Sequence, residues 1–138
     1  MGTLAARRVI GAFALIRIAI GSAAMASPNR FSDRADRPNH LLMIRSFAGR
    51  EMALGVGGCL ALRGSAPVST LSMWAGLGAM TDAADLIAAI ANLRRGDRSA
   101  RAAALLAAIG LVSEGSALAF LRGQTDAPGR GASAGNTE

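Results

Sequence analysis

Residues 9–26 read VIGAFALIRIAIGSAAMA, an apolar run of membrane-spanning length with one arginine, Arg17, in its middle. A transmembrane helix needs about 20 predominantly apolar residues to cross the hydrocarbon core of a bilayer. A charged side chain near the bilayer centre costs about 2.5 to 3.5 kcal/mol on insertion scales, so Arg17 requires a partner and a position away from lipid. The run therefore predicts a membrane helix that packs against other helices through its arginine.

The end of this run also resembles the cleavage site of a secretory signal peptide, because Ala24-Met25-Ala26 is followed by Ser27 and Pro28. A signal peptide has an unbroken apolar core, which the central arginine interrupts. We expect the first span to be retained, with cleavage as the alternative.

A second span is predicted over residues 46–62. Its uninterrupted apolar segment, 52–62, is too short to cross a bilayer, so Arg50 and Glu51 must enter the span at its beginning. We expect both charges to lie inside the membrane.

Two further spans are predicted over residues 68–90 and 102–121. The stretch 27–39 is polar and contains proline, which is typical of a loop. Residues 40–47 suit an interfacial approach to the second span. The third span holds Asp82 and Asp85, and the fourth holds Glu114.

These spans predict an all-α fold, a four-helix transmembrane bundle forming one domain over residues 1–123. The Gly- and Ser-rich tail, 124–138, is predicted to be disordered. The chain is 51% hydrophobic and 17% charged, more apolar than an ordinary soluble domain. A soluble Ala-rich bundle is the alternative, but four runs of near-membrane length separated by Arg-rich or Pro-containing turns favour the membrane.

The arginines indicate topology and location. All basic residues are Arg, which, with abundant Ala and Gly, suggests a GC-rich bacterium and a multi-pass protein of its inner (plasma) membrane. The positive-inside rule places the first and third loops in the cytoplasm and both termini outside, by seven arginines to five. Although the net charge is +6, these arginines lie between apolar runs rather than along one face, so we expect no nucleic-acid partner. The seven are Arg30, Arg34, Arg37, Arg94, Arg95, Arg98 and Arg101; the five are Arg7, Arg8, Arg63, Arg122 and Arg130.

Every predicted span has a glycine four residues from a charge, which places the two on one helix face. Small residues let membrane helices approach closely, while large apolar side chains suit lipid. We therefore expect the charges to meet inside the bundle. The pairs are Arg17 with Gly21, Glu51 with Gly55, Asp82 with Gly78, and Glu114 with Gly110.

Depth along the spans groups these charges. At 1.5 Å per residue, five fall in the bilayer half nearest the first and third loops, while Glu114 is predicted nearer the opposite side. Two arginines facing at least three carboxylates permit bidentate pairing with negative charge in excess. The candidate site, an intramembrane charge cluster or an ion or substrate site, comprises Arg17, Arg50, Glu51, Asp82, Asp85 and Glu114.

A short internal repeat supports one of these pairings. The segment RIAIG beginning at Arg17 aligns with EMALG beginning at Glu51, which places opposite charges at equivalent positions. An ion pair between these two side chains is the testable consequence.

The sequence leaves the function open between classes. We expect a non-enzymatic structural or accessory subunit, with no catalytic residue, metal or cofactor. Its partners would be the lipid bilayer and either a second copy or another membrane protein. The alternative is a small oligomeric transporter or channel that uses the buried carboxylates to carry protons or cations. An enzyme acting on a lipid is a third, weaker reading, and the chain contains neither an HExxH motif nor a Walker loop.

The segment GREMALG, residues 49–55, followed by the D-x-x-D motif of Asp82 and Asp85, resembles a family of small four-span proteins of high-GC bacteria. That family is classed as a domain of unknown function, and the similarity covers residues 5–122. The resemblance implies the four-span fold. It carries no activity, cofactor or substrate to this chain.

Overall fold

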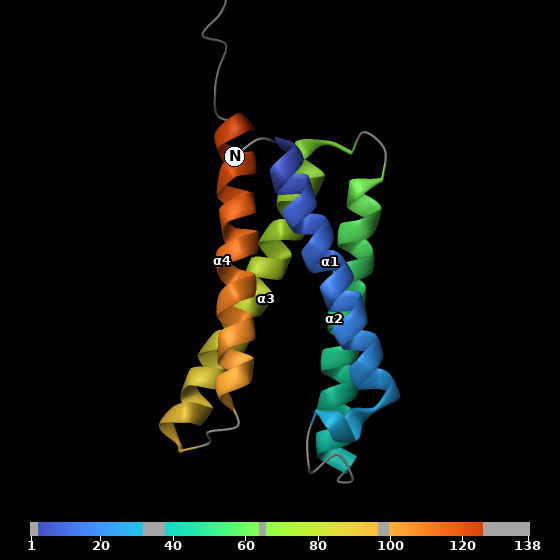
Figure 1. The fold of residues 1–138 in the computed structure, drawn as a ribbon, viewed down its shortest axis with the longest axis vertical. Coiled ribbons are helices and arrows are strands. Elements are labelled where there is room, and N and C mark those ends of the chain that lie inside the picture. The colour runs from blue at the N-terminus through green and yellow to red at the C-terminus, as the bar shows by residue number, and fades with distance from the viewer. Residues whose placement is uncertain (1–2, 32–37, 64–65, 97–99, 126–138) are drawn as a thin grey trace, which may run out of the picture.

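Four long helices make up the part of the chain that the computed structural model describes, residues 3–31, 38–63, 66–96 and 100–125 (Figure 1). The predicted all-α fold is confirmed. The predicted disordered tail lies outside the described residues, except for Gln124 and Thr125, which belong to the last helix. The helices are α1 (Thr3–Ala26), α2 (Pro38–Leu62), α3 (Val68–Arg94) and α4 (Ala100–Thr125), and a short 3-10 helix, η1 (Pro28–Arg30), follows α1.

The second helix is longer than the sequence analysis predicted. It begins at Pro38, so the expected loop 27–39 is shorter and the expected approach segment 40–47 is part of the helix. Proline suits the first turn of a helix, because its missing N–H has no intrahelical acceptor there. As a result, Arg50 and Glu51 lie at the middle of a 25-residue helix and do not open it.

Three of the four helices are long and apolar enough to cross a membrane. They are Leu4–Ala26, Val68–Arg94 and Ala100–Gly123, with mean hydropathies of 2.0, 1.2 and 1.9. The helix α2 is of comparable length, but Arg45, Arg50 and Glu51 make it less apolar. Its crossing of the membrane stays a prediction.

Small residues fill the interior of the bundle and large apolar residues cover its surface. Among the described residues, eleven of the fourteen buried hydrophobic ones are alanines. Many leucine, isoleucine and methionine side chains are exposed, among them Met43 and Met80 at 70% and Ile87 at 69%. Water would penalise such a surface, whereas lipid accommodates large side chains and small residues let helices approach. The distribution is that of a membrane helix bundle.

The helices pack as two hairpins, α1 with α2 and α3 with α4, and each helix has most of its contacts within its own hairpin. Two glycines allow the close approach of α1 and α2. A Cβ on Gly21 would lie 2.7 Å from the Ala48 carbonyl oxygen and 2.7 Å from Met52 Cγ, and a Cβ on Gly55 would lie 2.5 Å from the Ala14 carbonyl oxygen. Glycine is therefore required at this crossing because backbone fills the space that a side chain would occupy.

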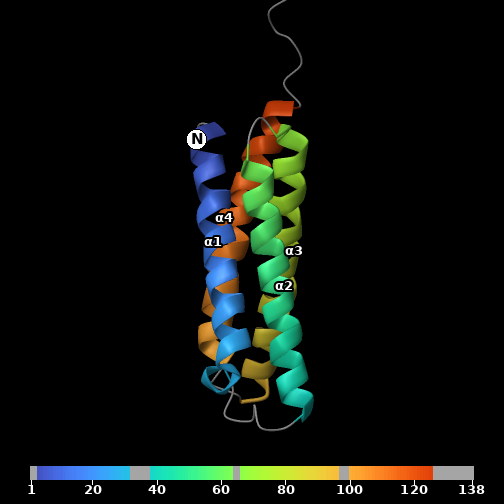
Figure 2. The same cartoon turned by 90° about the vertical axis from the view of Figure 1, so that its right-hand side faces the viewer.

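The two hairpins differ in separation along the bundle. At the end where α1 begins and α2 meets α3, here called the α2–α3 end, an apolar cluster including Ile10, Leu71 and Leu121 joins both hairpins. Toward the opposite end, called the η1 end, the hairpins diverge (Figure 1), and the view at 90° shows all four helices running along the same long axis (Figure 2). At the η1 end α3 stops before Gly96, whose φ of +87° is a left-handed conformation that favours glycine.

Substitution of Gly55 by alanine tests the close crossing of α1 and α2. We expect Gly55→Ala to lower the free energy of unfolding by about 1 to 3 kcal/mol, because the added Cβ meets backbone that must move. The measurement is SDS titration of the detergent-solubilised protein.

The matched control is Gly49→Ala on the same helix, where an added Cβ has nothing within 4 Å. This control should leave stability unchanged or raise it by up to about 1 kcal/mol, since alanine favours helix more than glycine does. Equal behaviour of the two variants would contradict the packing described here.

Candidate functional site

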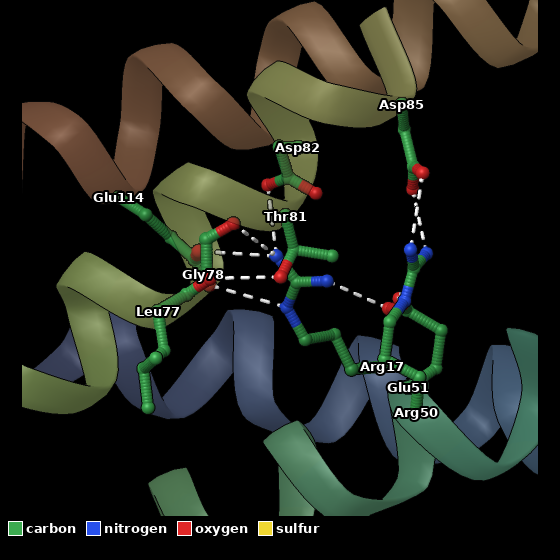
Figure 3. Close-up of polar contacts among 9 residues, drawn as sticks. All are labelled: Arg17, Arg50, Glu51, Leu77, Gly78, Thr81, Asp82, Asp85 and Glu114. Atoms are coloured by element: carbon green, nitrogen blue, oxygen red, sulfur yellow. Dashed lines mark hydrogen bonds and ion pairs between the residues drawn. The ribbon is translucent and has the colours of Figure 1, made fainter. Parts of the chain in front are cut away.

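The guanidinium of Arg17 lies at the centre of the bundle and bonds to the three other helices (Figure 3). Its Nη1 donates to Glu51 Oε2 of α2 at 2.7 Å, and its Nη2 donates to Asp82 Oδ2 of α3 at 2.8 Å. Its Nε and Nη2 donate to both carboxylate oxygens of Glu114 on α4, at 3.3 and 3.1 Å. The four residues are only 4 to 7% exposed. One arginine thus links all four helices.

A second arginine extends this cluster toward the surface. Arg50 Nη1 and Nη2 donate to Asp85 Oδ1 and Oδ2 at 3.1 and 2.7 Å, a bidentate pair. Its Nε and Nη2 also donate to Glu51 Oε1, at 3.2 and 3.0 Å. Glu51 therefore bridges the two arginines, one through each carboxylate oxygen. The predicted Arg17–Glu51 pair is confirmed.

The two ends of this cluster differ in exposure. The side chains of Arg50 and Asp85 are each 37% exposed, whereas those of Arg17, Glu51 and Glu114 are at most 7% exposed. The ring of Phe47 lies beneath Arg50, with its centroid 5.3 Å from the guanidinium carbon, within the range of a cation–π contact. We use the name charge network for Arg17, Arg50, Glu51, Asp82, Asp85 and Glu114, the six residues that the sequence predicted and that the structure brings together.

The side chain of Glu114 reaches across the depth that separates it from Arg17. Its backbone position lies nearer the α2–α3 end of α4, on the side that the sequence predicted, and its carboxylate pairs directly with Arg17. Counted from the η1 end, Arg17 is nine residues from Ala26 and Glu114 fourteen from Ala100. Five residues correspond to an axial difference of about 7.5 Å, which two long side chains span.

Glycines opposite two of the carboxylates make room for them. The carboxylate of Glu114 occupies the space where a Cβ on Gly78 would lie, and the carboxylate of Asp82 occupies that of Gly110. Each carboxylate of the α3–α4 hairpin thus packs on a glycine of the facing helix, and each glycine is four residues from the other carboxylate. The glycine spacing read from the sequence marks these helix contacts.

The charge network is satisfied internally. No buried side-chain nitrogen or oxygen lacks a hydrogen-bond partner among the described residues. A cavity of about 10 Å³ lies beside Arg17, Glu114 and Trp74, which is room for one water molecule at most. In the described part of the chain, no three His, Cys, Asp or Glu side chains are arranged to hold a metal ion. Among the described residues, the arrangement offers ion pairing beside a cavity of about one water molecule.

Two participants were not predicted from the sequence. The Gly78 carbonyl accepts a hydrogen bond from Arg17 Nη2 at 3.3 Å. The sequence does not show which backbone carbonyls a side chain can reach, so this contact could not be predicted. Phe47 was detectable, because it lies three residues before Arg50 and hence on a neighbouring part of one helix face. Thr81, beside the charge network in Figure 3, instead donates to the Leu77 carbonyl of its own helix at 2.8 Å.

No family model, curated protein sequence or solved structure matches this chain. Its resemblance to the four-span family of unknown function stays a prediction.

Replacement of the central arginine tests the charge network. We expect Arg17→Gln to lower the free energy of unfolding by about 3 to 5 kcal/mol, because two buried carboxylates, Asp82 and Glu114, lose their counter-charge and Glu51 keeps only Arg50. Arg17→Lys should recover only part of this loss, since an ammonium cannot reproduce the forked contacts of a guanidinium. Unfolding in SDS measures both.

A double-mutant cycle with Glu51→Gln isolates the pair. The two single changes should not add, because each removes the same interaction. Arg8→Gln, an exposed arginine on the same helix, is the control and should leave stability within about 0.5 kcal/mol of the parent. Additive effects in the cycle would show that the two side chains are not coupled.

Proposed function

We propose that the chain is a multi-pass protein of a bacterial inner membrane that acts as a structural or accessory subunit and not as an enzyme. The charge network then serves to fix the four helices in one arrangement. The observation that supports this most is that the hydrogen-bond donors of both arginines are occupied. Each arginine uses all three guanidinium nitrogens to donate to carboxylates within the bundle. A scaffold of this kind would present its outer surface to lipid and to a second copy or another membrane protein.

Space supports the same proposal. Binding sites for small molecules are concave and usually enclose about 300 to 1,000 Å³. The cavity beside Arg17 and Glu114 is about 10 Å³. A group that binds and releases a substrate would have to break several charge-assisted hydrogen bonds first, each of which is stronger than a neutral one.

The position of Arg17 on α1 supports retention of the first span. Removal of residues 1–26 by a signal peptidase would take away the only cation paired with Asp82 and Glu114 among the described residues. The remaining helices would then keep two buried carboxylates without a partner, at high cost in a bilayer. The proposed mature protein therefore includes α1.

One observation favours the alternative, a small oligomeric proton- or cation-linked transporter or channel. The charge network contains four carboxylates and two arginines, an excess of two negative charges inside the predicted membrane region. Such an excess attracts a proton or a metal cation. The half-exposed Asp85 is the carboxylate through which an ion would enter.

The variant Asp82→Asn/Asp85→Asn separates the two proposals. For a structural network we expect the free energy of unfolding to fall by about 1 to 3 kcal/mol, because charge-assisted bonds become neutral ones. We also expect proteoliposomes of the parent protein to pass no more protons than empty liposomes. An enclosed pH-sensitive dye reports the flux, and SDS titration reports stability.

The control for this experiment is Ser116→Ala, which removes an intramembrane hydroxyl that bonds only to the Val112 carbonyl of its own helix. Proton flux in the parent that disappears in a folded double variant, but not in the control, would establish the transporter and end the structural proposal.

Reporter fusions test the orientation. We expect a fusion after Arg95, in the third loop, to place green fluorescent protein in the cytoplasm, where it is fluorescent, because this loop and the first carry more arginines. A fusion after Arg63, in the second loop, is the matched control and should be active only with alkaline phosphatase. The reverse pattern would invert the proposed topology.

A further inference from the structure

The inner face of α2 continues past the charge network toward the η1 end. His40, Ile44 and Phe47 follow one another at spacings of four and three residues, and Glu51 lies four residues beyond Phe47. Residues at these spacings share one face of a helix. The face that buries Glu51 in the bundle centre is therefore apolar, apart from His40, over the two turns that precede it.

No described residue of α3 or α4 lines the groove on this part of the face. An open groove of about 300 Å³ lies here, and the described residues that line it come only from α2 and from the turn after η1. The two hairpins diverge at this end of the bundle (Figure 1). The lining residues are Phe31, His40, Met43, Ile44 and Phe47.

The lining of the groove suits an apolar occupant. The groove is open, about 300 Å³ in volume, and apart from His40 it is formed by phenylalanine, methionine and isoleucine. A flexible hydrocarbon chain can follow such an apolar surface. In the membrane setting proposed above, acyl chains are the ligands available at this depth.

The charges around the groove identify the headgroup. Positive charge gathers at the η1 end, where α3 ends, α4 begins and η1 lies, and Arg30 directly precedes Phe31 of the groove wall. Basic residues near the membrane surface each contribute about 1 kcal/mol of attraction to anionic lipid. Exposed arginines among the described residues at this end are Arg30, Arg45, Arg94, Arg95 and Arg101.

We propose that the groove is a binding site for an anionic phospholipid, with one acyl chain against Met43, Ile44 and Phe47 and the phosphate among the arginines of the η1 end. The acyl chain would cover the apolar face of α2 where the hairpins part. The occupied groove reaches Phe47, whose ring supports Arg50, so a bound lipid shields the exposed end of the charge network. This site requires a membrane location but not the structural role proposed for the charge network.

Native mass spectrometry of the detergent-purified full chain tests the site, with phosphatidylglycerol and phosphatidylcholine of identical acyl chains added in turn. We expect the parent protein to retain phosphatidylglycerol in preference to phosphatidylcholine. Met43→Glu should reduce this retention to the level of phosphatidylcholine, because it places a negative charge in the groove. Leu42→Glu is the matched control, since Leu42 is adjacent and equally exposed, 67% against 70%, but does not line the groove.

One exposed arginine gives a second test that leaves the apolar groove intact. Arg30→Gln should weaken retention of phosphatidylglycerol about fivefold, which corresponds to about 1 kcal/mol. Retention of phosphatidylcholine should not change.

The proposal is overturned if the parent protein retains both lipids equally, or if Leu42→Glu loses as much phosphatidylglycerol as Met43→Glu. Unfolding in SDS, measured on the same preparations, distinguishes this failure from failure of the structural proposal. A lipid site can be absent while substitutions in the charge network still destabilise the bundle.

Discussion

The structure depends on the burial of one guanidinium, that of Arg17, in a place that lipid cannot solvate. Its charge is offset only because α2, α3 and α4 each bring a carboxylate to it, at donor–acceptor distances of 2.7 to 3.3 Å. Leaving such a charge unpaired in hydrocarbon is costly, and pairing it requires all four helices at once. The helix arrangement and the ion pairing are therefore one constraint, since neither is favourable without the other.

This constraint divides the bundle along its length. On one side of the charge network, toward the α2–α3 end, both hairpins share an apolar cluster built around Leu71 and Leu121. On the other side, toward the η1 end, the hairpins part and the face of α2 is left open. The charge network thus lies where two hairpins that are each tightly packed stop contacting one another. That position makes its outer pair, Arg50 and Asp85, the only half-exposed members of the six.

Glycine is what allows carboxylates to reach this depth. In the α3–α4 hairpin, Glu114 fills the space beside Gly78 and Asp82 fills the space beside Gly110. Each of the two helices therefore contributes one carboxylate and one glycine that makes room for the carboxylate of the other helix. In the α1–α2 hairpin the equivalent glycines, Gly21 and Gly55, face backbone and apolar side chains instead. Small residues in membrane helices therefore serve two purposes here: close contact in one hairpin and space for ion pairs in the other.

The sequence by itself determined the helical class, the end of a helix just before Arg63 and another just before Gly96, the six ionisable residues, and the glycine that shares a face with one charge of each helix. These follow from local rules, because apolar length and a period of 3.6 residues can be read along the chain. Only the tertiary structure decided that α2 starts as early as Pro38, that Glu114 reaches Arg17, and that the Gly78 carbonyl joins the charge network. The physical reason is that a depth counted in residues ignores the tilt of the helix and the length of the side chain. A long side chain can place its charge several ångströms along the helix axis from its own Cα, which equals the rise of several residues. Where the two hairpins part is likewise a property of their packing, which no single stretch of the sequence contains.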